Sequence, residues 1–220
     1  MGRTSISVLL DLDGTLVDSQ SGIQASCRAA LRALGHEPAP SMDLATIIGP
    51  PIDRVMQQLL APYGDGRVTE AVAAYREHYG FVGLLESTVY PGVGDALDHL
   101  AAAGAALYVA TSKPTATARC ILAHLGLSER LSGIYGAAAD GSLSEKTPLI
   151  AHILEREGLE AGRCVMVGDR RYDIVGAHAN GVRAVGVLWG YGTREELTQA
   201  GADLLIGHPV ALAAASGCAP

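Results

Sequence analysis

Asp11-Leu12-Asp13-Gly14-Thr15-Leu16 follows a short apolar run, residues 6–10, that contains one serine. A run this short and branched predicts a buried strand, and Gly14 predicts a turn directly after it. Two aspartates one residue apart at a strand's end are costly to bury without a cation or hydrogen-bond donors. We therefore interpret the stretch as a functional site. The alternative is a plain turn in which an aspartate caps the next helix.

Beyond this turn, residues 18–86 carry apolar side chains at helical spacing and show no strand pattern. Three amphipathic helices are predicted, the second starting at Ile52 and the third running from Val68 to Tyr79. Glycines and prolines separate them, as in the Gly49-Pro50-Pro51 turn. Helix upon helix in this position predicts a small helical domain inserted after the first strand, with residues 1–17 and 87–220 forming the rest.

From Tyr90 onward, short apolar runs alternate with helical patterns of about a dozen residues. This alternation predicts βαβ units and a parallel sheet, hence an α/β fold. The ligand of such a sheet lies beyond the carboxyl ends of its strands. The strands after the first are predicted at residues 105–110, 134–136, 163–167, 182–187 and 202–206.

Composition restricts the classes of function. The chain has 220 residues, a net charge of −7 and a pI of about 5.4, which argue against nucleic-acid binding and a basic membrane patch. Four widely spaced cysteines indicate a reduced, cytoplasmic protein, and neither a signal peptide nor a membrane span is predicted. The expected partner is a small molecule, and the chain is expected to be a monomer or homodimer.

Polar residues at the predicted strand ends form a single constellation. Converging acids need a cation, because like charges this close cannot all ionise unaided. Oxygen ligands without histidine or cysteine indicate Mg²⁺. A metal site with a lysine and a threonine hydroxyl is typical of phosphoryl chemistry. Backbone N–H groups of the turn at Gly14 and Thr15 are further candidate phosphate donors. The constellation consists of Asp11, Asp13, Thr111, Ser112, Lys146, Asp169 and Asp173.

The available nucleophile is a carboxylate, because the sequence offers no Ser/His/Asp or Cys/His arrangement. Asp11 is expected to attack phosphorus and form an aspartyl-phosphate. Asp13 is expected to protonate the leaving alkoxide and then to deprotonate the water that releases phosphate. Lys146 completes the predicted catalytic set, and general acid–base help of this kind contributes roughly 10²–10⁴-fold.

The sequence resembles the haloacid dehalogenase superfamily of phosphohydrolases, specifically the phosphoglycolate phosphatase-like group with a helical cap. The resemblance spans nearly the whole chain and rests on residues 11–19, Thr111-Ser112, Lys146 and Gly168-Asp169 with Asp173. It implies a Rossmann-like core, with residues 18–86 as the cap. It also implies that Mg²⁺ is held by Asp11, the backbone carbonyl of Asp13 and Asp169, with Asp173 binding it directly or through water.

Two residues depart from the usual pattern of that superfamily. Thr147 separates Lys146 from Pro148, and Arg170 follows Asp169 where serine or threonine is commoner. Both departures favour a branch other than the glycolate-specific enzymes. Some similar sequences are 5′-nucleotidases, so phosphoglycolate and a nucleoside monophosphate are both candidate substrates.

Several residues near the motifs have two interpretations. Lys113 either reaches the phosphate or leaving group, or is a solvated lysine at a helix start. Asp18 and Ser19 are expected to cap the first inserted helix. Arg170 is expected to be a surface charge, or alternatively to close the rim of the site. Hinges are expected near residues 16–19 and 85–91, and substrate specificity is expected from the 48–51 loop.

Three other functions remain open at this stage. A sugar-phosphate mutase shares the second aspartate, Asp13. A phospho-acceptor signalling module also gathers aspartates, a threonine and a lysine at strand ends, but such modules are about half this length. A catalytically inactive scaffold is the third. A Mg²⁺-dependent phosphomonoesterase is the leading hypothesis.

Overall fold

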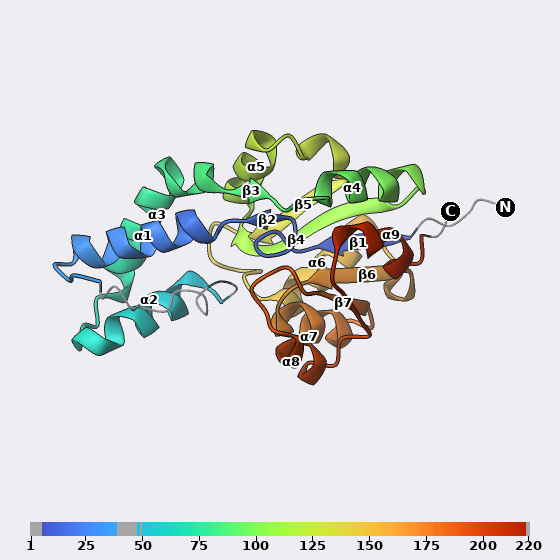
Figure 1. Ribbon diagram of the computed structural model, residues 1–220. Helices are drawn as coiled ribbons and strands as arrows, with labels where there is room; N and C mark the ends of the chain where they lie inside the picture. The colour runs from blue at the N-terminus through green and yellow to red at the C-terminus, as the bar shows by residue number, and fades with distance from the viewer. Residues whose placement is uncertain (1–5, 39–47, 49, 219–220) are drawn as a thin grey trace. The chain divides into compact units, whose positions relative to one another are not determined.

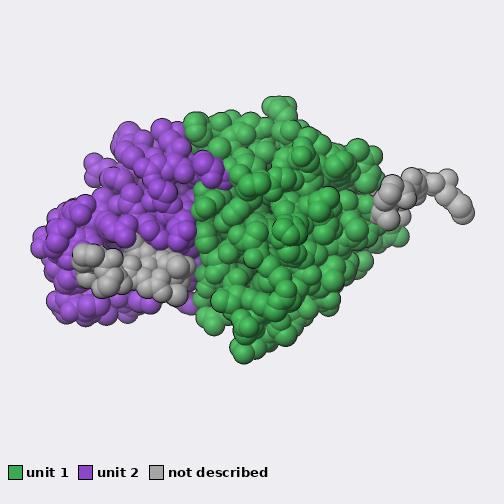
Figure 2. Space-filling model, viewed as in Figure 1, with its two compact units in different colours: residues 1–18, 89–220 green, residues 19–88 purple. Residues whose placement is uncertain are grey.

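The computed structural model of the protein describes residues 6–38, 48 and 50–218. The chain forms two compact units, residues 1–18 with 89–220 and residues 19–88 (Figure 2). The boundaries expected from the sequence were 17/18 and 86/87. No helix within the described residues is long and apolar enough to cross a membrane.

The larger unit is built on a six-stranded sheet in the order β5-β4-β1-β6-β7-β8, and every pairing is parallel (Figure 1). The predicted α/β class is therefore confirmed. Strands β4 and β6 flank β1, so the order reverses at the centre, where ligands of open α/β sheets bind. The strands are β1 (Ser7–Leu10), β4 (Ala106–Pro114), β5 (Gly133–Ala137), β6 (Cys164–Gly168), β7 (Arg183–Val187) and β8 (Leu204–Ile206).

Helices cover both faces of this sheet, with α4 and α5 on one side and α6, α7 and α8 on the other (Figure 1). Two covered faces require strands that are apolar throughout, which explains the short continuous runs in the sequence. The helices are α4 (Val93–Ala102), α5 (Thr115–His124), α6 (Lys146–Glu157), α7 (Arg171–Ala179), α8 (Arg194–Gln199) and α9 (Leu212–Ala215).

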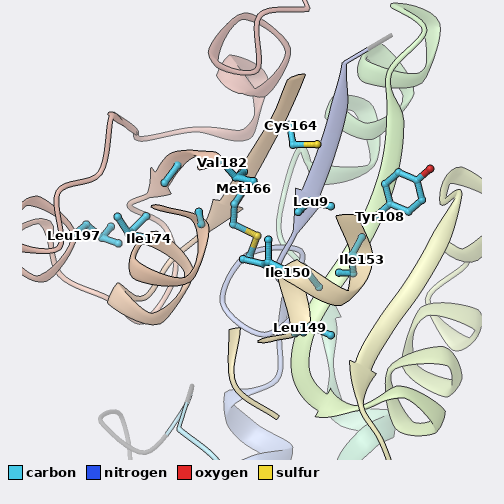
Figure 3. Packing of buried hydrophobic residues seen from close by; sticks show 13 residues of the cluster. Leu9, Tyr108, Leu149, Ile150, Ile153, Cys164, Met166, Ile174, Val182 and Leu197 are labelled. Carbon is cyan, nitrogen blue, oxygen red and sulfur yellow. The ribbon is translucent and has the colours of Figure 1, made fainter. Parts of the chain in front are cut away.

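The core under α6 and α7 forms around one row of the sheet. Leu9 of β1 is level with Tyr108 of β4 and Met166 of β6, and all three belong to one buried cluster (Figure 3). Ile150 of α6 and Ile174 of α7 are fully buried in the same cluster. Each such side chain stabilises the fold by about 1.5–3 kcal/mol relative to an exposed one. This packing fixes the starts of α6 and α7, which carry polar residues to the sheet's carboxyl edge.

The end of β4 differs from the prediction, which stopped the strand at residue 110. The strand continues to Pro114 with a shift of register after Ala110. Glycine at position 136 permits this, because a Cβ there would lie 2.2 Å from the carbonyl oxygen of Lys113. The Thr111–Pro114 segment is therefore held as extended backbone beside β5 instead of forming a loop.

The smaller unit consists of the three predicted helices, α1 (Gln20–Ala33), α2 (Ile52–Leu60) and α3 (Val68–Phe81). Each buries the apolar face that its periodicity indicated, for example Val55, Met56, Leu59 and Leu60 of α2. Two short strands, β2 (Val17–Asp18) and β3 (Thr88–Val89), pair where the chain enters and leaves this unit. Strands of two residues carry no periodicity, so the sequence did not predict them. Of the loop expected to set specificity, Gly49 lies outside the described residues.

Candidate active site

The carboxyl edge of the sheet brings together residues from β1, β4, β6 and α6. Asp11 directly follows β1, and its N–H extends the ladder by donating to the carbonyl of Val167 at 2.9 Å. Asp169 directly follows β6, and Thr111 lies in the extended end of β4. Asp11, Thr111 and Asp169 are all buried. As the strand-end rule predicts, these three residues come together although they are up to 158 positions apart in the sequence (169 − 11).

Lys146 lies at the centre of the acidic cluster. Its Nζ lies 2.7 Å from Asp11 Oδ1 and 2.6 Å from Asp173 Oδ1, and it donates to the carbonyl of Ala110 at 2.7 Å. The geometry toward Asp173 Oδ1 is an ion pair and not a well-aligned hydrogen bond. Gly176 lets the start of α6 approach α7, because a Cβ there would meet Lys146 Cβ at 2.7 Å. The ammonium group therefore contacts two carboxylates from different segments and offsets part of their negative charge.

Three of the acids lie close together in the protein interior. Asp11, Asp169 and Asp173 each place a carboxylate oxygen within 4.8 Å of the others, and all three are buried. Burial raises the pKa of Asp11 from 3.8 to about 7, with Lys146 opposing the rise and Asp173 adding to it. Burial, and then the charges of Asp11 and Asp173, raise the pKa of Asp169 well above its usual value. A cation at this position would relieve the repulsion.

Asp173 also shapes the backbone beside the site. Its Oδ2 accepts the N–H of Arg170 at 3.0 Å, which closes the first turn of α7. Only glycine fits at position 168, because a Cβ there would lie 2.2 Å from Asp173 Cγ. Gly168 therefore allows Asp173 to pack against the backbone, and the next residue, Asp169, offers a carboxylate that could bind a metal ion.

Asp13 forms an ion pair with a second lysine, Lys113. Lys113 Nζ lies 3.0 Å from Asp13 Oδ2, and the Lys113 side chain is only 7% exposed. The N–H of Lys113 donates to Thr111 Oγ1 at 3.1 Å, which orients the threonine. The interpretation of Lys113 as a solvated lysine is therefore wrong. Lys113 and Lys146 are the only lysines in the sequence, and each faces one carboxylate of the Asp-x-Asp pair.

The turn after β1 differs in part from the prediction. Gly14 has φ 86°, and a Cβ there would lie 2.3 Å from Asp169 Oδ2. The N–H of Gly14 donates to Val17 O at 2.8 Å and that of Thr15 to Leu12 O at 3.3 Å. Thr15 Oγ1 donates to Asp169 Oδ1 at 3.3 Å. The predicted phosphate donors Gly14 and Thr15 are thus engaged in holding the turn and Asp169. Ser112 is half-buried beside Thr111, and its phosphate role stays a prediction.

The Trp189–Gly192 loop, which follows β7, was not predicted to belong to the site. Tyr191 donates its N–H to Asp169 Oδ2 at 2.8 Å, and Trp189 donates its indole N–H to Thr15 O at 3.0 Å. A signal was available, because β7 is parallel to β1 and β6 and so ends at the same edge of the sheet. The two glycines alternating with aromatic residues also indicate close backbone packing.

Two predictions about neighbouring side chains are wrong. Ser19 occupies the N-cap of α1 but makes no capping side-chain hydrogen bond, and Asp18 accepts from the hydroxyl of Tyr191 at 2.9 Å. Arg170 is not a surface charge, and the alternative that it closes the rim of the site stays a prediction. Its side chain is 12% exposed, and its guanidinium pairs with Glu196 of α8 at 2.9 Å. The partners of Asp18 and Arg170 are distant in the sequence, so local sequence patterns do not predict them.

Comparison with known proteins identifies the family. The sequence profile of the haloacid dehalogenase-like hydrolases matches residues 8–187, which is most of the chain. The chain belongs to this family. Its strand order, acidic cluster and buried lysine are thus those of a hydrolase core, and the family expected from residues 11–19 is confirmed.

Relatives of this hydrolase carry several names. A 5′-nucleotidase of Pseudomonas aeruginosa is 42% identical over 193 residues, which cover 87% of this chain and 86% of the relative. A phosphoglycolate phosphatase of Rhodospirillum rubrum is 31% identical over 204 residues, covering 89% of this chain and 84% of the relative.

A third relative has a name from a different class. The tyrosine-protein kinase PtkA of Mycobacterium tuberculosis is 44% identical over 193 residues, which cover 87% of this chain but only 65% of PtkA. A solved structure of PtkA matches with a TM-score of 0.81 at 40% identity, covering 98% of this chain and 100% of that structure.

The donor set of this hydrolase fits a divalent cation. The four carboxylates of Asp11, Asp13, Asp169 and Asp173 share two lysines, which leaves an excess of two negative charges when all are ionised (4 − 2). Three of these carboxylates offer closely spaced, buried oxygen atoms and no sulfur or nitrogen ligand. Oxygen-only sites of this charge suit Mg²⁺.

Proposed function

We propose that this hydrolase is a Mg²⁺-dependent phosphomonoesterase that works through an aspartyl-phosphate at Asp11. The observation that carries the proposal is the placement of Asp11. It lies beyond a strand end, 2.7 Å from a buried lysine and among acids whose mutual repulsion calls for a cation. A carboxylate held in this way has a fixed position at the carboxyl edge of the sheet, where ligands of such folds bind.

The chain's own groups account for both half-reactions. In the first, an Asp11 oxygen forms a bond to phosphorus while the ester P–O bond breaks, and Asp13 gives its proton to the leaving oxygen. In the second, Asp13 takes a proton from water, whose oxygen forms the new bond to phosphorus, and Asp11 leaves as a carboxylate. Lys146 holds Asp11 throughout, and Thr111, Ser112 and Lys113 are proposed to bind phosphate oxygens.

Asp11, the carbonyl of Asp13 and Asp169 would hold Mg²⁺, with Asp173 beside them. When bound, the ion neutralises phosphate charge and orients the transferring group. Replacing Asp11 with asparagine tests the nucleophile, because the variant keeps the shape of the side chain but cannot form the ester. Phosphate release from p-nitrophenyl phosphate should disappear while the circular dichroism spectrum stays native. Retained turnover would remove Asp11 from the mechanism.

The helical unit is proposed to act as a cap that excludes bulk water during phosphoryl transfer. Its two connections through β2 and β3 support this, because short paired strands suit a hinge. The negative net charge supports a small-molecule substrate over a nucleic acid. We expect a nucleoside 5′-monophosphate to be preferred, since the 5′-nucleotidase shares 42% identity and the phosphoglycolate phosphatase 31%.

A panel of phosphate esters ranks these substrates. We expect the highest kcat/KM for a nucleoside 5′-monophosphate, with 2-phosphoglycolate next and hexose phosphates lower. A preference for 2-phosphoglycolate would reverse the order of the two candidates. A monophosphate that is isomerised without stoichiometric phosphate release would indicate a mutase. A long-lived phospho-Asp11 without turnover would indicate a signalling module.

A second candidate is transfer of the phosphoryl group to a tyrosine hydroxyl, favoured by the 44% identity to PtkA. In that reaction the acceptor oxygen replaces water in attacking the phosphorus. Incubation with ATP and Mg²⁺, followed by detection of phosphotyrosine on this chain and on a tyrosine peptide, decides between the two. Phosphotyrosine that is absent from the Asp11→Asn variant would establish transfer. Release of inorganic phosphate alone would establish hydrolysis.

A further inference from the structure

Tyr191 contacts two functionally different parts of the larger unit. Its N–H donates to Asp169 Oδ2 at 2.8 Å, and its hydroxyl donates to Asp18 Oδ1 at 2.9 Å. The strand that holds Asp18 pairs in turn with β3. Asp18 is the last residue of β2, and Tyr90 directly follows β3. One residue therefore joins a proposed metal ligand to one of the segments that connect the two units and, through it, to the other.

The loop around Tyr191 has little freedom to move independently of Asp169. A Cβ at position 192 would lie 1.8 Å from the carbonyl oxygen of Asp169, and one at position 190 would lie 2.2 Å from that of Gly14. The indole of Trp189 is tied to the carbonyl of Thr15 at 3.0 Å. The glycines thus let the loop's backbone pack directly against the backbone of Gly14 and Asp169, so a displacement of Asp169 must be transmitted to Tyr191.

The two connecting segments are also held by hydrogen bonds. The N–H of Tyr90 donates to the carbonyl of Leu16 at 3.2 Å, which places β3 beside the chain that leads into β2. The Tyr191 hydroxyl adds a charge-assisted bond to Asp18, a class of hydrogen bond stronger than neutral ones. Losing that hydroxyl removes the link to Asp18 but leaves the backbone N–H on Asp169.

We propose that Tyr191 is a positioning residue that couples Asp169 to the two connecting segments, Val17–Asp18 and Thr88–Tyr90. Occupation of the site by Mg²⁺ orders these segments through Tyr191, and the ordered segments in turn favour the occupied site, because coupling between sites is reciprocal. The inference rests on the proposed function in one respect, namely that Asp169 is a metal ligand. The alternative is that the Tyr191 hydroxyl contributes only to stability.

Hydrogen exchange with Mg²⁺ alone as the probe separates these possibilities. In the native protein, we expect Mg²⁺ to slow amide exchange in peptides covering residues 16–19 and 88–91. In Tyr191→Phe, this slowing should be lost, and the Mg²⁺ concentration that half-saturates the thermal shift should rise by the factor that the lost coupling supplied, without Mg²⁺ binding being abolished. The kcat/KM for a phosphate ester should fall by about 10- to 150-fold, the range for one hydrogen bond to a charged group.

Three further variants complete the experiment. Tyr135→Phe is the matched control, since it removes a tyrosine-to-carboxylate hydrogen bond, to Glu157, elsewhere in the same unit. It should behave as the native protein in every measurement except stability. Asp18→Ala should reproduce Tyr191→Phe, and combining the two should add nothing, because both remove the same bond. Asp18→Asn, which keeps an acceptor oxygen, should restore part of the slowing.

The outcomes distinguish this inference from the proposed function. If the native protein hydrolyses no phosphate ester but Mg²⁺ still slows exchange only when the Tyr191 hydroxyl is present, the coupling stands and the proposed function fails. If hydrolysis occurs but Tyr191→Phe matches Tyr135→Phe in exchange and kcat/KM, the coupling is overturned. Loss of Mg²⁺ binding in Tyr191→Phe would also overturn it, because the hydroxyl would then act on the metal site directly.

Discussion

Lys146 lies between two buried carboxylates, and replacing it with methionine removes its charge while keeping a similar length. The variant leaves Asp11 and Asp173 facing each other without the cation that lies 2.7 Å and 2.6 Å from them. Removing one partner of a buried ion pair destabilises a protein by about 3–5 kcal/mol. For a chain of this size, each 1 kcal/mol lowers Tm by about 2–4 °C, so a drop of about 6–20 °C is expected in EDTA at pH 8.5.

The loss should depend on pH in a defined direction. The pKa of Asp11 is raised from 3.8 to about 7 in the folded protein, so stability falls as pH rises from about 4 to about 7. Without Lys146, the pKa of Asp11 rises further, because the largest influence opposing burial is gone. The decline then continues above pH 7. At pH 5, Asp11 is protonated with or without the lysine, and the two proteins should differ less.

Urea unfolding in EDTA at pH 5, 7 and 8.5 measures this difference. Arg130→Met is the control, because it breaks an ion pair with Asp98 at 2.6 Å whose side chains are 33% and 56% exposed. Exposed pairs contribute about 0–1 kcal/mol, so this control should show a small loss with no trend over this pH range. A loss below about 1 kcal/mol for Lys146→Met at pH 8.5, or one equal at pH 5, would refute the view that the lysine counters buried charge.

Three further outcomes are expected. Asp169→Asn should unfold at a higher urea concentration than the native protein in EDTA at pH 8, since burial disfavours the carboxylate, yet gain no stability from Mg²⁺. Asp203→Asn is its control and should be destabilised, because hydrogen bonds from Ala184 and His178 lower the pKa of Asp203. Gly168→Ala should cost more than about 2 kcal/mol by displacing Asp173, whereas Gly94→Ala, with open space in α4, should stabilise by about 0.5–1 kcal/mol in thermal unfolding. Phosphate release should stop in excess EDTA and return with Mg²⁺; turnover that survives chelation would contradict the metal assignment.

Most helices and strands of the fold could be predicted from the sequence, because their apolar patterns are local and periodic. The apolar residues of α2 recur every three to four positions, and the runs around Leu9 and Met166 are apolar throughout. Parallel strands end at a common edge, so Asp11 and Asp169 could be placed together without coordinates. The lysine of α6 followed from the same rule, since helices begin where the preceding strand has ended.

Features that depend on distant partners were not predictable. Thr15 could have faced a ligand or a neighbouring carboxylate, and only tertiary contact with Asp169 decides between them. Arg170 follows a metal-type aspartate but turns toward Glu196, which is 26 residues away. The Trp189–Gly192 loop contains no titratable acid or base other than a tyrosine, so a search for chemistry passed over it. Its importance is that its two glycines allow the loop to pack against the backbone of Gly14 and Asp169.

The sequence contains only two lysines, so amine-directed reagents have few possible targets in this protein. Positive charge elsewhere in the sequence is supplied by 14 arginines (16 − 2), which amine-directed reagents do not modify. Apart from the amino terminus, acylation or reductive alkylation can therefore reach only Lys113 and Lys146, whose side chains are 7% and 5% exposed. The rate at which such a reagent labels the chain depends on the opening of the carboxyl edge and on release of each amine from its carboxylate partners. A ligand that occupies the edge would protect both amines at once, which offers a binding assay that requires no turnover.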